Sequence, residues 1–155
     1  MIDSTTGQIQ LAVDGISVGP SLTPEQVLAS PMASAVKVLD LGEGPVSISM
    51  PKVRCVGHDV YCTLLFENLV LRRVAIVCDD PIFEELTWLN YNASERPDFE
   101  RKRLLLMERK RIHDSMIAAG LGSDWRERHF VWGSVASHFS EKYGGSSIIL
   151  VTYGG

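Results

Sequence analysis

Three residues near the middle of the chain have the types and spacing of a metal-binding cluster. Cys55, His58 and Cys62 form a C-x2-H-x3-C pattern, and Cys78 is the one further residue that could complete it. Zinc prefers a tetrahedron of thiolate and imidazole ligands, usually from two paired clusters, and this sequence offers one. If residues 57–59 form a hairpin turn, the two cysteines are simply small buried residues beside an exposed turn histidine. We favour that interpretation and expect neither a metal nor another cofactor.

Serine and histidine lie close together in two places, which raises the question of nucleophilic catalysis. One is the pair Ser137 and His138, and the other is the run His113, Asp114 and Ser115. A catalytic serine needs a base and an orienting group that meet in space, and no G-x-S-x-G elbow occurs. Ser137 and His138 are neighbours on an expected strand, so their side chains point to opposite faces. We therefore assign no catalytic residue and favour a binding protein over an enzyme.

An enzyme or small-molecule binder remains the alternative, and it would need a cleft between sheet and helices. The residues that could line such a cleft are three histidines and two acids able to orient them: His113, His129, His138, Asp114 and Glu127. This alternative requires the fold to bring these side chains together.

Two basic triplets lie about two turns apart in the longest expected helix. They occupy residues 101–103 and 109–111, and an acid precedes each one. Such a surface could bind nucleic acid or an acidic protein. The chain has a formal net charge of −4, which removes the simplest electrostatic reason for binding phosphates. We expect a protein partner and no nucleic acid, with contacts from Arg101, Arg109 and Lys110.

One aromatic residue is a candidate for the same interface. Trp125 is flanked by charged residues at positions 124 and 126–128, which indicates an exposed loop. Tryptophan and arginine are frequent anchors of protein interfaces. Trp125 and Arg126 therefore join the expected partner-binding residues.

Alternating hydrophobicity predicts that strands dominate the chain. Ile9, Leu11 and Val13 begin the pattern, and a β-rich stretch runs from residue 36 to residue 78. Two neighbouring strands should bury matching faces, one made by Val60, Cys62, Leu64 and Phe66 and the other by Val74, Ile76 and Cys78. The short connections exclude parallel crossovers and predict an antiparallel meander. Further strands are expected at residues 130–138 and 147–153, joined by a turn at residues 142–145.

Helix signals occur in three places. Thr23, Pro24 and Gln26 form a capping box with proline at the first helical position. A second helix should begin after residues 79–81, and the longest should span residues 97–119. Its expected apolar stripe consists of Leu104, Leu105, Ile112, Met116 and Ile117. Residues 1–155 are thus expected to form a single α+β domain, with an antiparallel β-sheet of about six or seven strands, a short N-terminal helix and a two-helix segment packed on one face.

The composition is that of an ordinary globular protein. Hydrophobic residues make up 45% and charged residues 22% of the 155 positions. No apolar run approaches the length of a membrane span, and the N-terminus has no signal-peptide pattern. Three cysteines in a chain without a signal indicate free thiols in a reducing compartment. We expect a cytoplasmic protein with no membrane partner.

Several turn and core motifs carry a family resemblance across most of the chain. They are residues 19–25, residues 65–68 with Leu71, residues 132–135 and residues 144–148. In these motifs the chain resembles small uncharacterised bacterial proteins, some of which are similar to immunity proteins encoded beside toxins. The resemblance implies a fold and an inhibitor of a protein partner, and it transfers no functional residue.

Three hypotheses follow from the sequence. The first is a non-catalytic bacterial binding protein that acts as an immunity-like inhibitor of a protein partner. The second is the cleft-based small-molecule binder or enzyme. The third is a structural subunit that forms a homodimer through a sheet edge, with residues 148–152 as the candidate strand because it is apolar on both faces.

Overall fold

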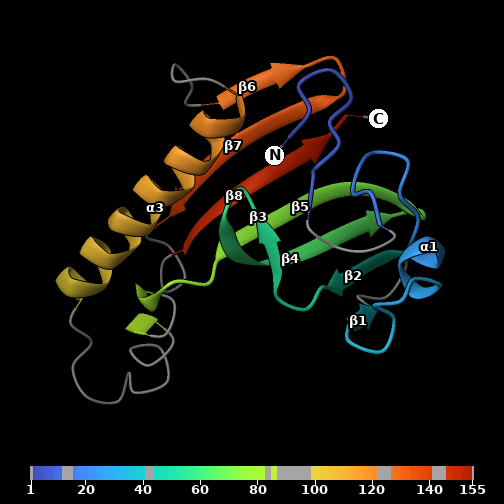
Figure 1. Ribbon diagram of the computed structural model, residues 1–155, viewed down its shortest axis with the longest axis horizontal. Helices are drawn as coiled ribbons and strands as arrows, with labels where there is room; N and C mark the ends of the chain where they lie inside the picture. Colours follow the sequence, from blue (N-terminus) through green and yellow to red (C-terminus); the bar gives the residue numbers. More distant parts are fainter. Residues whose placement is uncertain are drawn as a thin grey trace.

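The computed structural model describes residues 2–11, 16–40, 44–82, 85–86, 99–121, 127–140 and 146–154, with the side chains of residues 99 and 127 left aside. Within these residues one antiparallel sheet of eight strands dominates (Figure 1). Its order is β1-β2-β4-β5-β8-β7-β6, and β3 pairs with β4 off this path. The α+β class and the antiparallel pairing are confirmed, with eight strands in place of six or seven.

The elements have the following bounds. The strands are β1 (Lys37–Asp40), β2 (Pro45–Ser49), β3 (Val53–Cys55), β4 (His58–Glu67), β5 (Val70–Cys78), β6 (Glu127–Phe130), β7 (Gly133–Ser140) and β8 (Ser146–Tyr153). The helices are α1 (Pro24–Leu28) and α3 (Phe99–Leu121). Residues 81–82 and 85–86 are also helical, and Ile82 and Leu86 pack with Leu106 of α3.

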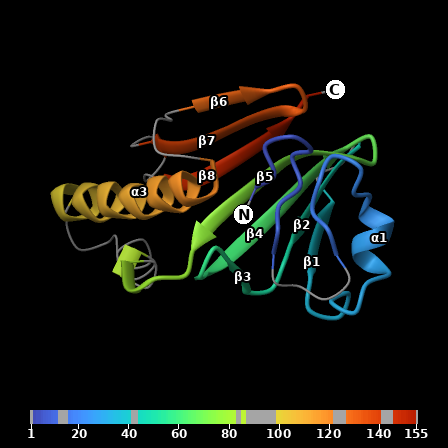
Figure 2. The ribbon, with the colours of Figure 1, turned by 45° about the horizontal axis from the view of Figure 1, so that its top comes forward.

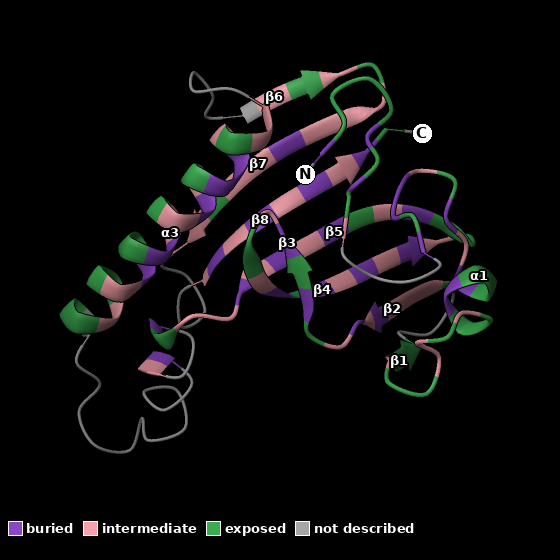
Figure 3. Ribbon diagram, in the orientation of Figure 1, coloured by how far each residue is buried: buried purple, intermediate pink, exposed green. Residues whose placement is uncertain are grey.

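Burial alternates along the central strands with the period of two of a β-strand, and a register shift opposite Leu65 and Phe66 interrupts the alternation in β5. Along β4 the buried residues are Val60, Cys62, Leu64 and Phe66, and along β5 they are Leu71, Val74, Ile76 and Cys78. Cys62 pairs with Ile76, and Ile76 pairs with Ile149 of β8. Figure 3 shows the same alternation of buried and half-buried residues along β5 and β8. The matching faces expected for β4 and β5 are confirmed.

The helix α3, the strand β3 and the N-terminal segment all lie on this buried side of the sheet (Figures 1 and 2). The helix packs against β5, β7 and β8, and Ile9 and Val18 of the N-terminal segment belong to the main core. Two hydrogen bonds hold the segment down: the Tyr153 hydroxyl donates to the Gly7 carbonyl at 2.9 Å, and Trp132 Nε1 donates to the Ser4 carbonyl at 3.0 Å. We call this side of the sheet the covered face.

The N-terminal region follows the sequence signals for its helix and departs from them for its strand. Thr23 caps α1, and the backbone N–H of Thr23 in turn donates to the side chain of Gln26, so the expected capping box is confirmed. Of the strand expected from Ile9, Val13 lies outside the described residues, and Ile9 makes isolated bridges with Ile2 and Val18. The packing of this segment against the core replaces a full ladder of backbone hydrogen bonds.

Two expectations for the C-terminal strands were wrong. The strand expected at residues 130–138 is split into β6 and β7 by a turn at Val131 and Trp132. Gly133 follows with φ of 150°, and a Cβ there would lie 2.0 Å from the Thr152 carbonyl oxygen, so only glycine fits. The candidate dimer edge at residues 148–152 is also not an edge, because β8 is hydrogen-bonded to both β5 and β7. The expected turn at residues 142–145 lies outside the described residues.

The long helix buries part of the expected stripe: Met116 and Ile117 are buried, and Leu105 and Ile112 are partly buried against the hydrophobic clusters. Its buried residues are Leu106, Arg109, His113, Met116 and Ile117, whereas Leu104 is exposed. The helical period is preserved, but two polar residues take core positions. No helix among the described residues is long and apolar enough to cross a membrane.

Candidate functional site

The metal-like grouping does not converge. The β3–β4 turn is formed by Val56 and Gly57, so His58 begins β4 opposite Cys55 and is exposed. Cys55 and Cys62 are buried and not joined in a disulfide, and burial raises the pKa of Cys62 to about 12. Within the described part of the chain, no group of three or more His, Cys, Asp or Glu side chains could hold a metal ion.

His113 lies at the centre of a polar network buried between α3 and the sheet. Its Nε2 accepts a hydrogen bond from the backbone N–H of Cys78 at 3.3 Å, and its Nδ1 lies 3.1 Å from the Ser147 hydroxyl. Because a backbone N–H can only donate, Nε2 carries no proton and the Nδ1–H donates to Ser147. The imidazole is therefore neutral, with one tautomer fixed by its surroundings.

The electrostatics of the site agree with that tautomer. Desolvation by burial, followed by the nearby Arg109 charge, lowers the pKa of His113 to about 4. Protonating Nε2 would break the bond to Cys78 and place a cation in the core. Ser147 and His113 are both buried, so no substrate can reach the hydroxyl. This serine–histidine pair supports the fold and does not resemble an accessible nucleophile and base.

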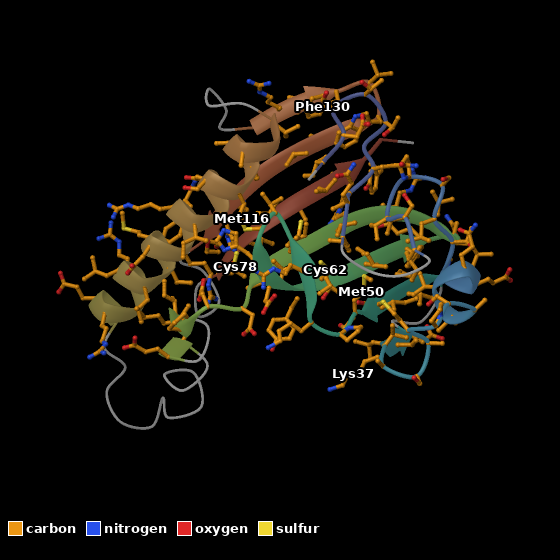
Figure 4. All side chains as sticks on the ribbon, in the orientation of Figure 1. Lys37, Met50, Cys62, Cys78, Met116 and Phe130 are labelled. Carbon is orange, nitrogen blue, oxygen red and sulfur yellow. The ribbon has the colours of Figure 1, made fainter. Side chains whose placement is uncertain are left out.

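Two further contacts tie α3 to the last residue of β5 and to Asp80 just beyond it. Arg109, which is only 4% exposed, donates to Asp80 Oδ1 at 2.9 Å. The Cys78 thiol lies 3.0 Å from Met116 Sδ, and Figure 4 shows these two side chains next to each other beneath the helix. The polar side chains of Arg109 and His113 are thus buried beside Met116 and Ile117 of the expected stripe.

The histidines proposed for a cleft fall on opposite sides of the sheet. The His113 side chain points from α3 to the covered face, whereas the pairing of His138 with Ile148 and of His129 with Ser134 puts both on the other face. Ser137 points toward α3 and accepts from Lys110 Nζ at 3.5 Å, which confirms that Ser137 and His138 do not cooperate. Asp114 is paired with Lys110 at 2.8 Å. The side chain of Glu127 is not among those that the structure describes.

The basic residues expected to bind a partner make intramolecular ion pairs. Arg101 Nε donates to Glu85 at 2.6 Å, Lys110 pairs with Asp114, and Arg109 faces the sheet. Arg101 and Lys110 retain exposed surface, so a contact from them stays a prediction. Trp125 and Arg126 lie outside the described residues.

A second surface, not recognised from the sequence, lies on the side of the sheet away from α3. We call it the open face, because no described element covers it (Figure 2). It is built by the alternate residues of the four central strands: Tyr61, Thr63, Leu65, Arg73, Ala75, Val77, Ser134, Ala136, His138, Ile148, Leu150 and Thr152. The register aligns Thr63, Ala75, Leu150 and Ala136 in one row across the sheet.

The open face is apolar at its centre. An antiparallel sheet with one solvated side usually alternates apolar inward with polar outward residues. Here β8 instead alternates Ile148 and Leu150 with its buried residues, and β5 contributes Ala75 and Val77 to the same side. The sequence signal for this apolar face is the run of aliphatic residues in β8. In the sequence analysis the same run was interpreted as an edge strand that forms a dimer.

Two pockets border the covered face. One lies between α3 and the sheet and is lined by apolar residues and a thiol, among them Cys55, Ile76, Met116, Ile117 and Ile149. The other lies beside α1 and is lined by uncharged amides, hydroxyls and aliphatic groups, among them Gln8, Ser17, Ser21, Gln26 and Ser30. Neither pocket holds a base beside a nucleophile.

Comparison with protein-family models, with curated proteins and with solved structures found no match. Function is therefore inferred from the geometry of the chain itself.

Proposed function

We propose that this chain is a non-catalytic protein-binding module that engages its partner through the open face of the sheet, as an immunity-like inhibitor would. The observation that carries the proposal is the apolar centre of that face, where Ala75, Val77, Ile148 and Leu150 occupy positions that solvated sheets give to polar residues. These four side chains are half-buried in the described fold, and an apolar patch that solvent still reaches is a feature of interaction sites in soluble proteins.

The shape and the charge of the open face support a protein partner. Small residues such as Ala75, Ala136 and Ser134 keep the surface low, so that another sheet or a helix can approach closely. Polar groups surround the centre, including Arg73, Tyr61 and His138. An apolar centre with a polar rim is the organisation of protein interfaces.

Affinity capture from the native host with two charge-insertion variants tests the proposal. Leu150→Lys places a charge at the centre of the open face, and Met107→Lys places the same charge on the outer side of α3, where Met107 is exposed. We expect the wild type and Met107→Lys to retain one stoichiometric protein partner, read by native mass, and Leu150→Lys to lose it. Equal capture by both variants would count against the open face.

A further inference from the structure

The outer side of α3 carries a stripe of four exposed residues: Glu100, Leu104, Met107 and Arg111. Their spacings of four, three and four positions place them on one side of an α-helix. That side is opposite to the residues that the helix buries against the sheet, and Figure 3 shows exposed residues recurring along α3. We call these four residues the outer stripe.

The middle of the outer stripe is apolar. Leu104 is 61% and Met107 is 38% exposed, and residues three positions apart on a helix are neighbours. Alternating spacings of three and four residues around an apolar centre are those of the seam along which two α-helices pack. The outer stripe therefore has the spacing that receives another helix.

The two ends of the outer stripe have opposite charges. Glu100 lies four residues before Leu104, and Arg111 lies four residues after Met107. Within the part of the chain that the structure describes, neither Glu100 nor Arg111 takes part in a salt bridge. The stripe thus runs from an acid through two apolar residues to a base, with equal spacing on either side of its centre.

This order makes the outer stripe complementary to a second copy of itself. In an antiparallel pair with a two-fold axis at the centre of the stripe, Leu104 meets Met107 of the second copy. Glu100 then meets Arg111 of the second copy, and the symmetry repeats each contact. A parallel pair would instead place Glu100 against Glu100 and Arg111 against Arg111, which repel each other. The charges therefore select the antiparallel arrangement.

The flanks of the outer stripe are compatible with that arrangement. On one flank Glu108 comes opposite Arg101 of the second copy, a pair of opposite charges. On the other flank Arg103 comes opposite Lys110 of the second copy. The Lys110 ammonium already pairs with Asp114 at 2.8 Å, which reduces the repulsion on that flank.

We propose that the chain forms a homodimer in which the outer stripes of two copies pack antiparallel. The helix lies along one border of the molecule, at the opposite end from α1 (Figures 1 and 2). The contact is on the side of α3 that faces away from the open face, so this inference goes beyond the proposed function and does not rest on it. A contact through one helix is smaller than a standard interface, so the dimer is a weak and reversible one.

Charge reversal at the ends of the stripe tests the pairing without changing the core. Glu100→Arg and Arg111→Glu each bring like charges together at both ends of the dimer, because the symmetry repeats the contact. We expect each variant to raise the Kd of the dimer about tenfold or more in sedimentation equilibrium. Glu25→Arg in α1 and Lys37→Glu in β1 are the matched controls, since both residues are exposed and far from α3, and they should leave the Kd unchanged.

Mixing the two single variants gives the most specific result. In the mixed dimer one copy carries arginine at both end positions and the other carries glutamate at both, so every end contact again joins opposite charges. We expect native mass spectrometry to show the heterodimer in excess of either homodimer. The double variant Glu100→Arg/Arg111→Glu should dimerise as the wild type does.

The remaining outcomes separate the dimer from the proposed function. A wild type that stays monomeric at its highest soluble concentration overturns the dimer alone, and so does a dimer that both single variants retain. A dimer that the single variants lose and the mixture does not restore overturns the antiparallel pairing. Met107→Lys should be monomeric and still capture the partner of the open face. If Met107→Lys loses that partner and Leu150→Lys keeps it, the outer stripe binds the partner and both proposals are overturned.

Discussion

The two faces of the sheet are built from the same strands, yet one is buried in the core and the other is left uncovered by the described elements. On the covered face, Phe66, Val74 and Val151 are completely buried beneath α3 and the N-terminal segment, and the polar side chain of His113 has a hydrogen-bond partner at each ring nitrogen. On the open face, Leu65, Ala75 and Leu150 are the adjacent residues in sequence and are only half-buried. The covered face accounts for stability, and the open face offers apolar surface that the described fold does not use.

The largest difference in the effect of a substitution on stability is expected between two neighbouring residues of β4. Phe66→Ala leaves a large cavity in the core and should lower the free energy of unfolding by about 4 kcal/mol. Leu65→Ala removes a half-exposed side chain and should cost less than about 1 kcal/mol. Urea denaturation of both variants measures the difference, and similar losses would mean that the open face is covered in solution.

A smaller difference in stability loss is expected between substitutions of two arginines of α3. Arg109→Ala leaves Asp80 buried without its cation and should destabilise the fold by about 3 kcal/mol. Arg101→Ala breaks an exposed pair with Glu85 and should cost no more than about 1 kcal/mol. If thermal denaturation ranks them in the opposite order, the buried network does not hold α3 on the sheet.

The dependence of stability on pH sharpens the same comparison. Burial lowers the pKa of His113 from 6.5 to about 4, so between these values the unfolded chain binds a proton that the folded chain does not. Stability is therefore complete above pH 6.5 and falls as the pH drops toward 4, by on the order of 2–3 kcal/mol. His113→Gln should lose this slope, whereas His138→Gln on the open face should keep it. Urea titrations at pH 7 and pH 4.5 give the change in the free energy of unfolding for each variant. An equal change in both variants would contradict the assignment of the pH dependence to His113.

Much of the fold could be predicted from local patterns. The capping box at Thr23 and the alternation in β4 and β5 are decided by neighbours in the sequence, and both were correct. The position of β8 could not be predicted, because an apolar strand suits either an interior place or an edge, and only its pairing with β5 and β7 decides. The break before β7 depends on the close approach of Gly133 to Thr152, a contact between distant residues.

The candidate site was harder to predict than the fold. His113 was named for a cleft, but its partners Cys78 and Ser147 are 35 and 34 residues away. Arg109 reads as one of several basic residues on a solvated helix until the helix packs and turns it toward Asp80. Each depends on tertiary contacts that periodicity does not report.

Hydroxyl-radical footprinting of the chain alone and in its captured complex tests the central claim most directly. Tyr61 and Leu65 report on the open face, and Met107 reports on the outer side of α3. We predict that the partner lowers the oxidation of Tyr61 and Leu65 while Met107 is oxidised as before. Protection of Met107 with unchanged oxidation of Tyr61 and Leu65 would move the interface to the helix and contradict this account.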